Sequence, residues 1–196
     1  MFRELLFPTP IYIADIEHPT LNQELERDIV AWSKKDKGIT RTNVQGWHSH
    51  TNMNELPEYQ KLVDMLYACQ KTIYNQEHLD SEPVLGNMWA NINPPGGMNR
   101  AHQHPNSLWS GVYYIKVPKN SGKLFLEDPR PGPNTHMPRR IEGIPEALWR
   151  VCAYEPAEGR MIFFPSWLPH GVDINLNTDK GEKNWRISVS FNFIQV

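Results

Sequence analysis

The sequence predicts a mainly β protein in which two antiparallel sheets pack on each other or close into a barrel-like roll, with two helices on one outer face. After Pro83 the chain consists of short segments rich in aromatic and β-branched residues, separated by Gly, Pro and Asn. Apart from a short piece at 144–148, no helical pattern lies between them, which argues against parallel βαβ units. Two amphipathic segments precede them and can cover one face of a sheet.

The N-terminal part is predicted to contain a short strand, two helices and a long loop. Residues 7–16 (FPTPIYIADI) should be extended, because apolar residues alternate and the prolines block a helix. Residues 18–35 and 55–76 repeat apolar side chains at helical spacing and are expected to form the helices. The stretch between them is polar and rich in Asn, Thr and Gly, so it is expected to be a loop.

The remaining chain is predicted to supply the strands of the roll. The predicted strands lie within residues 84–93, 107–117, 122–128, 148–154, 160–165, 171–175 and 184–196. With 196 residues and no internal repeat or linker, the chain is expected to form one domain. Within residues 1–196 we distinguish an N-terminal part, 1–83, from the core of the roll, 84–196.

Composition narrows the classes of partner. The net charge is −2 and no basic stripe is present, so no nucleic acid is expected. No apolar run is long enough to span a bilayer, and no membrane partner is expected. The two cysteines, Cys69 and Cys152, stand too far apart in sequence to suggest a zinc ribbon or a disulfide framework. Together with an N-terminus unlike a signal peptide, this predicts a cytoplasmic protein, and it leaves a homodimer open.

Histidines provide the main chemical signal. His102 and His104, in RAHQHPNSLWSGVYYI, stand two residues apart, and residues so spaced on a strand share a face. His170, in FFPSWLPHGV, is the candidate third ligand. Three neutral imidazoles suit Fe, Zn, Cu or Ni and leave coordination positions open for chemistry. The alternative is that these are ordinary surface histidines next to turns. His48 and His50 have the same spacing, and we interpret them as solvated loop residues, with a lid over the site as the weaker alternative.

The order of these motifs resembles a known family. NINPPGGMNRAHQH, then GKLFLEDPR, FFPSWLPHGV and WRISVSFNF, is similar to the Fe(II)/2-oxoglutarate-dependent oxygenases of the double-stranded β-helix fold, a jelly roll like that of cupins. More closely, the chain resembles a group of such oxygenases from marine bacteria and phages. The resemblance covers about residues 84 to 195. It implies a dioxygenase that hydroxylates a small-molecule or peptide substrate, with Fe(II) as cofactor and 2-oxoglutarate as co-substrate.

The resemblance also implies roles for single residues. Iron would be bound by His102, His104 and His170. Arg186, 16 residues after His170, would hold the far carboxylate of 2-oxoglutarate together with Ser188. Asn93, Asn91 and Tyr113 would face the same pocket. Alternation in the last strand places Arg186 and Ser188 on one face, either inward or toward solvent, and the position after His170 favours inward.

The sequence departs from the family pattern at one ligand. The usual Asp or Glu is replaced by His104, which leaves the charge of Fe(II) uncompensated. We favour a true three-histidine centre; the alternatives are a carboxylate from Asp173 or Asp128, or a degenerate site that binds metal poorly.

Two rival functions remain open. One is a cupin-like three-histidine metalloenzyme that does not use 2-oxoglutarate. The other is a non-catalytic jelly roll that binds a ligand. Substrate contacts are expected from the loops at 36–55 and 128–147, where Asp128 and Arg130 should form a local ion pair.

Overall fold

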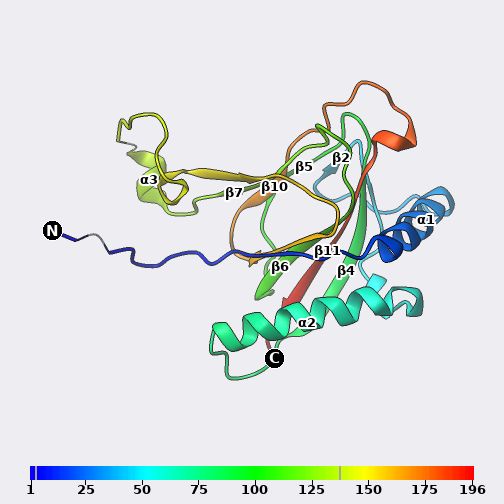
Figure 1. The fold of residues 1–196 in the computed structure, drawn as a ribbon, viewed down its shortest axis with the longest axis horizontal. Coiled ribbons are helices and arrows are strands. Elements are labelled where there is room, and N and C mark those ends of the chain that lie inside the picture. The colour runs from blue at the N-terminus through cyan, green and yellow to red at the C-terminus, as the bar shows by residue number, and fades with distance from the viewer. Residues whose placement is uncertain (3, 137) are drawn as a thin grey trace.

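The computed structural model describes residues 1–2, 4–136 and 138–196, and it confirms the predicted fold class (Figure 1). Two antiparallel sheets face each other, as in a jelly roll, and helices α1 and α2 lie against the outer face of the larger one. In spatial order, the six-stranded sheet contains β1 (Tyr12–Asp15), β9 (Arg160–Pro165), β6 (Trp109–Lys116), β11 (Arg186–Ile194), β4 (Val84–Asn93) and β3 (Trp47–His48). The five-stranded sheet contains β2 (Asn43–Val44), β5 (Met98–His102), β10 (His170–Val172), β7 (Leu124–Glu127) and β8 (Val151–Tyr154).

Strand β11 separates two environments. Alternate side chains Ile187, Val189, Phe191 and Phe193 are fully buried in the cluster formed with the helices. Helix α1 (Pro19–Lys35) contributes Leu21, Leu25 and Ile29 to this cluster, and α2 (Gln60–Gln76) contributes Leu62, Leu66 and Ile73. Burying each of these side chains stabilises the fold by about 1.5–3 kcal/mol. The other face of β11, with Arg186 and Ser188, looks into the space between the sheets, as the alternation requires.

The stretch between the two helices is more ordered than the sequence indicates. It holds β2, β3 and two short 3₁₀ turns, Met53–Glu55 and Pro57–Tyr59, and α2 starts only at Gln60. Strand β2 pairs with β5 and β3 pairs with β4, so residues 43–48 are hydrogen-bonded to both sheets. The prediction of a loop was therefore wrong here, because short polar strands pair through their backbone and leave little trace in side-chain pattern.

Strand β5 is also absent from the predicted strands. It ends at His102, so His104 lies beyond the strand and not on it. The connection from β7 to β8 contains α3 (Pro131–Thr135) and a 3₁₀ turn, Glu146–Leu148, and another such turn, Glu182–Asn184, precedes β11. Asp128 and Arg130 form the expected ion pair at the start of the connection from β7 to β8.

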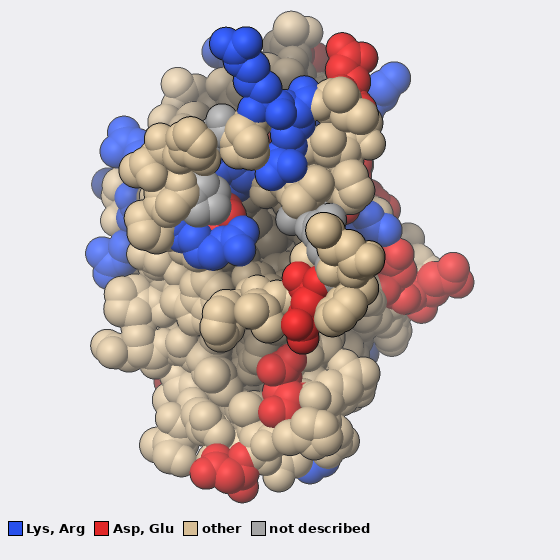
Figure 2. Space-filling model, turned by 90° about the vertical axis from the view of Figure 1, so that its left-hand side faces the viewer, with Lys and Arg blue, Asp and Glu red and all other residues tan. Residues whose placement is uncertain are grey.

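The surface at the α3 end carries both signs of charge. Figure 2 shows Lys and Arg side chains gathered in the upper half of this face, with Asp and Glu side chains mainly below and to the side. Among the described residues, no helix has the length and apolar composition needed to cross a membrane.

Candidate functional site

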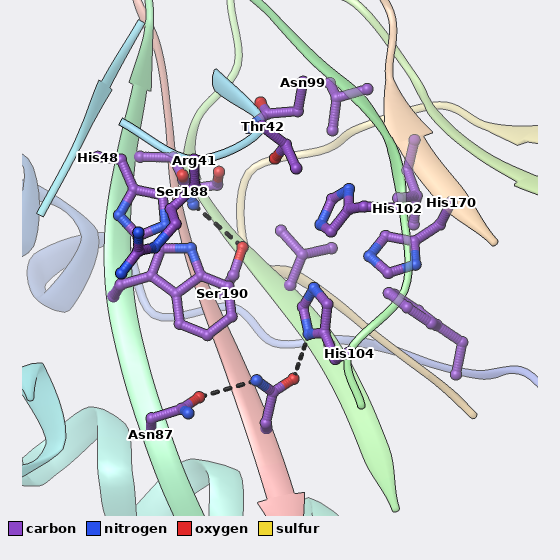
Figure 3. Close-up of a pocket in the computed structure, with 18 of the residues that line it drawn as sticks. Arg41, Thr42, His48, Asn87, Asn99, His102, His104, His170, Ser188 and Ser190 are labelled. Atoms are coloured by element: carbon purple, nitrogen blue, oxygen red, sulfur yellow. Dashed lines mark hydrogen bonds between the residues drawn. The ribbon is translucent and has the colours of Figure 1, made fainter. Parts of the chain in front are cut away.

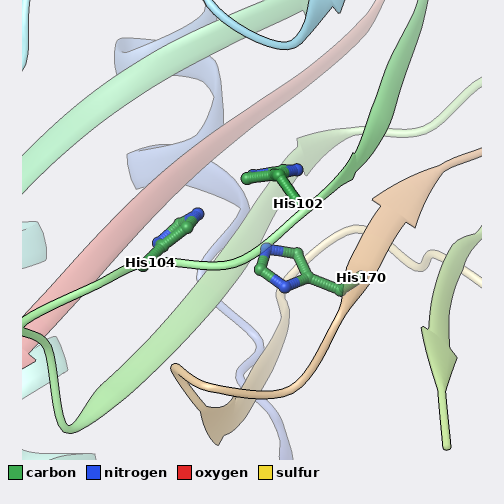
Figure 4. Close-up of side chains that lie close together, drawn as sticks. All are labelled: His102, His104 and His170. Carbon is green, nitrogen blue, oxygen red and sulfur yellow. The ribbon is translucent and has the colours of Figure 1, made fainter. Parts of the chain in front are cut away.

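The structure brings the three predicted imidazoles together (Figure 4). His102 ends β5, His170 begins β10, and the two are direct cross-strand partners. Ring centroids lie 4.4 Å apart for His102 and His170, and 4.9 Å for His104 with each of the others. The premise that His102 and His104 share a strand was wrong, because the chain leaves the sheet after His102. It returns His104 to the cluster from the connection to β6.

The candidate ligand nitrogens of the three rings all lie within 4.8 Å of one another. Three nitrogens bound to one ion at about 2.1 Å lie roughly 3.0–3.6 Å from one another, so each ring has to move toward the centre of the cluster by at most about 1 Å. Imidazole nitrogens also suit divalent iron chemically. The residues present therefore fit a metal ion.

Backbone carbonyls define the tautomers of two ligands. Nδ1 of His102 lies 2.8 Å from the carbonyl oxygen of Arg100, and Nδ1 of His170 lies 2.9 Å from that of Leu168. A carbonyl oxygen can only accept a hydrogen bond, so each Nδ1 carries the hydrogen. Nε2 is then the nitrogen with a free lone pair for a metal ion.

A side-chain network orients His104. Its Nδ1 lies 2.5 Å from Oδ1 of Asn192 and 3.0 Å from Oγ of Ser110. Asn192 in turn donates from Nδ2 to Oδ1 of Asn87 over 2.8 Å, which fixes the amide so that its oxygen faces the ring (Figure 3). The sequence indicated no role for Asn192; its only signal was its place on the polar face of the last strand.

Burial keeps the three imidazoles neutral. Desolvation, with a smaller contribution from the neighbouring imidazoles, lowers the pKa of His104 to about 4 and that of His170 to about 3. The pKa of His102 is lowered by the same cause. Neutral imidazole is the form that binds metal ions, so the cluster is ready to bind at neutral pH.

No carboxylate joins the three histidines among the described residues. Asp128, one candidate, is hydrogen-bonded to Arg130, which lowers the pKa of its carboxyl group. Asp173, the other, is exposed and does not line the cavity that holds the histidines. The structure thus offers a donor set of three imidazoles.

Arg186 is buried in the same cavity, with 1% of its surface exposed. Its Nη1 donates to the carbonyl oxygens of Ser121 (3.2 Å) and Gly122 (3.0 Å). Gly122 has a φ of +92°, and a Cβ there would lie 2.1 Å from the carbonyl oxygen of Asp173, so only glycine fits.

Within the described part of the chain, Nε of Arg186 has no hydrogen-bond partner and the guanidinium forms no ion pair. Burial lowers the pKa of Arg186, but a guanidinium remains charged in proteins. The charge of Asp173 acts on the guanidinium from a distance but forms no ion pair with it. A buried cation that no acidic group contacts is costly, which indicates a binding site for an anion.

Ser188 and Tyr114 line the cavity beside Arg186, and the two are cross-strand partners. Burial raises the pKa of Tyr114 to about 12, so its hydroxyl stays protonated and can donate. Tyr113, predicted to face this pocket, does not. Its hydroxyl donates to Oδ1 of Asn22 in α1 over 2.7 Å, because neighbouring residues of a strand point to opposite faces.

The two predicted asparagines lie on the same face of β4, opposite Ser188 and Arg186 of β11. Asn91 lines the cavity and donates to Oγ of Ser190 over 3.0 Å. Asn93 is buried and does not line the cavity; its Nδ2 donates to Oδ1 of Asn99, which does. Asn93 therefore acts on the cavity wall through Asn99.

The cavity between the sheets has a volume of about 390 Å³ (Figure 3). His48 lines it with 5% of its surface exposed, and its ring stacks on Trp89 with centroids 5.5 Å apart and planes at 7°. The prediction of a solvated loop residue was thus wrong for His48, whereas His50 is exposed. The repeated His-x-His spacing was visible in the sequence, but it does not indicate which of the two histidines is buried.

Comparisons with known proteins agree with this geometry. Residues 87–192 match the sequence model of the family described as "Putative 2OG-Fe(II) oxygenase". A comparison with curated protein sequences finds no match.

Solved structures share the fold at low sequence identity. A Pseudomonas putida prolyl-4-hydroxylase superposes with a TM-score of 0.66 at 14% identity, covering 95% of this chain and 92% of that chain. The non-heme alpha ketoglutarate dependent carbocyclase SnoK from nogalamycin biosynthesis gives 0.69 at 11% identity, covering 95% and 80%. HygX from Streptomyces hygroscopicus, with nickel and 2-oxoglutarate bound, gives 0.64 at 9% identity, covering 96% and 84%. With more than half of its length matched by the family's sequence model, this chain belongs to the 2OG-Fe(II) oxygenase family.

Proposed function

We propose that the protein is a dioxygenase that couples oxidation of 2-oxoglutarate to hydroxylation of a C–H bond in a second substrate. The observation that carries this proposal is the pairing of two features in one cavity. Three neutral imidazoles converge at one place, and the buried guanidinium of Arg186 faces the same space without an acidic partner among the described residues. A metal ion and a dianion that reaches from it to Arg186 would satisfy both.

Each group then has a role. His102, His104 and His170 would hold Fe(II) through Nε2. Arg186 would bind the far carboxylate of 2-oxoglutarate with its planar fork, which matches two carboxylate oxygens. The hydroxyls of Ser188 and Tyr114 would donate to the same carboxylate. When bound, Fe(II) supplies the activation of O₂ that converts 2-oxoglutarate to succinate and CO₂ and places one oxygen atom in the substrate.

The chain also keeps the reacting centre dry. The ring of Phe164 lies 4.5 Å from that of His170, and Val112 and Leu124 line the cavity nearby. Apolar walls exclude water and strengthen the electrostatic contacts inside. A rival cupin-like enzyme without 2-oxoglutarate has no use for a buried guanidinium, so Arg186 weighs against it.

The test is an anaerobic titration of the Fe(II)-loaded protein with 2-oxoglutarate, followed by its visible charge-transfer band. We expect a saturable band in the native protein. Arg186→Gln should raise the apparent Kd at least about tenfold, because a charge-assisted contact is lost, while iron content stays at one per chain. Arg160→Gln, which removes an arginine paired with Asp15 and outside the cavity, should leave the band unchanged. A native protein without the band, or an Arg186→Gln variant that binds equally well, would overturn the proposal.

A further inference from the structure

The charges that line the cavity are all of one sign. Among the described residues, its wall contains four histidines and two arginines but no aspartate or glutamate. The proposed function uses three of the histidines and Arg186. Arg41 and His48 have no part in it, and they need a separate account.

With iron and 2-oxoglutarate bound, the cavity would still have a net positive charge. Three neutral imidazoles leave both positive charges of Fe(II) in place, and Arg186 adds one. The two carboxylates of 2-oxoglutarate offset two of these, and Arg41 adds a further positive charge. The cavity then keeps an excess of roughly two positive charges, which attracts anions and repels cations.

Arg41 is the charge still available. It is exposed at the edge of the cavity, just before β2, and forms no ion pair or side-chain hydrogen bond with any residue that the structure describes. The segment is held by its backbone, since the amide of Arg41 donates to Oδ1 of Asn43 over 2.7 Å. Figure 3 shows Arg41 on the same side as His48, across the cavity from His102 and His170.

Aromatic rings connect Arg41 with the metal cluster. The positive charge of Arg41 helps to lower the pKa of His48, so the two groups are close enough to interact. His48 stacks on Trp89, and the ring of Trp89 lies 5.6 Å from that of His104. A molecule whose anionic end reaches Arg41 can therefore lie along Trp89 with its carbon skeleton near the metal site.

We propose that Arg41 binds an anionic group, a carboxylate or a phosphate, on the substrate to be oxidised, and that Trp89 packs against the adjoining carbon skeleton. This inference rests on the proposed function, because 2-oxoglutarate must occupy the deeper site at Arg186. The two arginines differ in burial and would bind different molecules. Arg186 is buried and binds the co-substrate, and Arg41 is exposed and binds the substrate.

The test uses benzoate and phenyl phosphate as probes, with benzamide as the uncharged counterpart of benzoate. Each is added to anaerobic, Fe(II)-loaded protein saturated with 2-oxoglutarate, and binding is measured by equilibrium dialysis and by paramagnetic broadening of the probe's proton signals. We expect both anions to bind and benzamide to bind at least about tenfold more weakly. The tighter of the two anions identifies the favoured group.

Variants then assign the effect to one side chain. Arg41→Gln should abolish the preference for anions, and Arg41→Lys should retain most of it. Arg160→Gln is the control, because Arg160 pairs with Asp15 and does not line the cavity.

Failure of this inference can be told from failure of the proposed function by the charge-transfer band in the same samples. If the native protein shows no band, the proposed function falls, and the substrate role of Arg41 falls with it. If the band is present and neither anion binds, or Arg41→Gln binds both anions as the native protein does, only the role of Arg41 is overturned.

Discussion

Oδ1 of Asn192 lies 2.5 Å from Nδ1 of His104, one of the three imidazoles that we propose as iron ligands. Asn87 holds the amide of Asn192 in place, so the oxygen and not the nitrogen faces the ring. The imidazole of His104 is thereby held in one tautomer and one orientation, as a carboxylate ligand would be by its own hydrogen bonds.

We predict that Asn192→Leu weakens Fe(II) binding about 10- to 100-fold, because the ring of His104 loses the acceptor that orients it. Competition with a chelator measures the affinity. In the metal-free protein, ¹⁵N NMR should show Nδ1 of His104 protonated in the native chain and a mixture of tautomers in the variant. Asn192→Asp keeps an acceptor and should preserve the tautomer. Unchanged affinity in Asn192→Leu would show that Asn192 does not position His104.

Replacing a ligand should remove the metal site. We expect one Fe(II) per native chain after anaerobic loading, and less than about a tenth of that in His170→Ala, because two imidazoles hold the ion too weakly. Fe(II) should also raise the melting temperature of the native protein and not that of the variant. His50→Ala, at an exposed position, is the control. Iron retained at full occupancy in His170→Ala would rule out the three-histidine site.

Adjacent tyrosines offer a matched pair. Tyr114→Phe should weaken 2-oxoglutarate binding by about three- to tenfold, through loss of one hydroxyl donor to the carboxylate, with little change in stability. Tyr113→Phe should leave 2-oxoglutarate binding unchanged and lower the free energy of unfolding by about 1 kcal/mol, because the hydrogen bond to Asn22 is lost. Titration with 2-oxoglutarate measures the first effect and urea denaturation the second. Weaker 2-oxoglutarate binding in Tyr113→Phe, with no weakening in Tyr114→Phe, would contradict the faces of β6 assigned to the two tyrosines.

The pH dependence of stability follows from the buried imidazoles. In the unfolded metal-free chain, His104 and His170 bind protons near pH 6.5; in the folded chain their pKa values are about 4 and about 3. Below pH 6.5 the unfolded state therefore binds more protons, and stability falls as pH falls toward 4.

Each of these two groups contributes a slope of up to about 1.4 kcal/mol per pH unit in that window. Urea denaturation at pH 7, 6 and 5 measures the slope. A variant with His104→Gln and His170→Gln should have a clearly shallower slope, with the remainder due to His102 and His48, whose pKa values are also lowered by burial. An equally steep slope in that variant would assign the effect to other groups.

The sequence predicted those strands whose side-chain pattern carries the signal. Strands β4 and β9 have the predicted bounds, because runs of aromatic and branched residues lie buried there. Strands β2, β3 and β5 were missed, since they are short, polar and stabilised by backbone pairing with segments distant in sequence.

The candidate site was also predictable only in part from the sequence. Residue type and spacing made the three histidines candidates, and the resemblance to the oxygenase family added Arg186. The fold then brings all four together. The choice between Tyr113 and Tyr114 was not available from sequence, because β6 is buried on both faces and alternation gives no sign of which one looks inward. An irregularity in pairing between Ile187 and Ser188 shifts the register further.

The short stretch 43–48 links the two sheets of the roll, because its ends pair with opposite sheets. The walls cannot part there without breaking one of the two pairings or pulling residues 45–46 straight between them. The opening beside Arg41 and His48 should thus keep a nearly constant width. A substrate would then be selected by its own shape and charge, without closure of the protein around it.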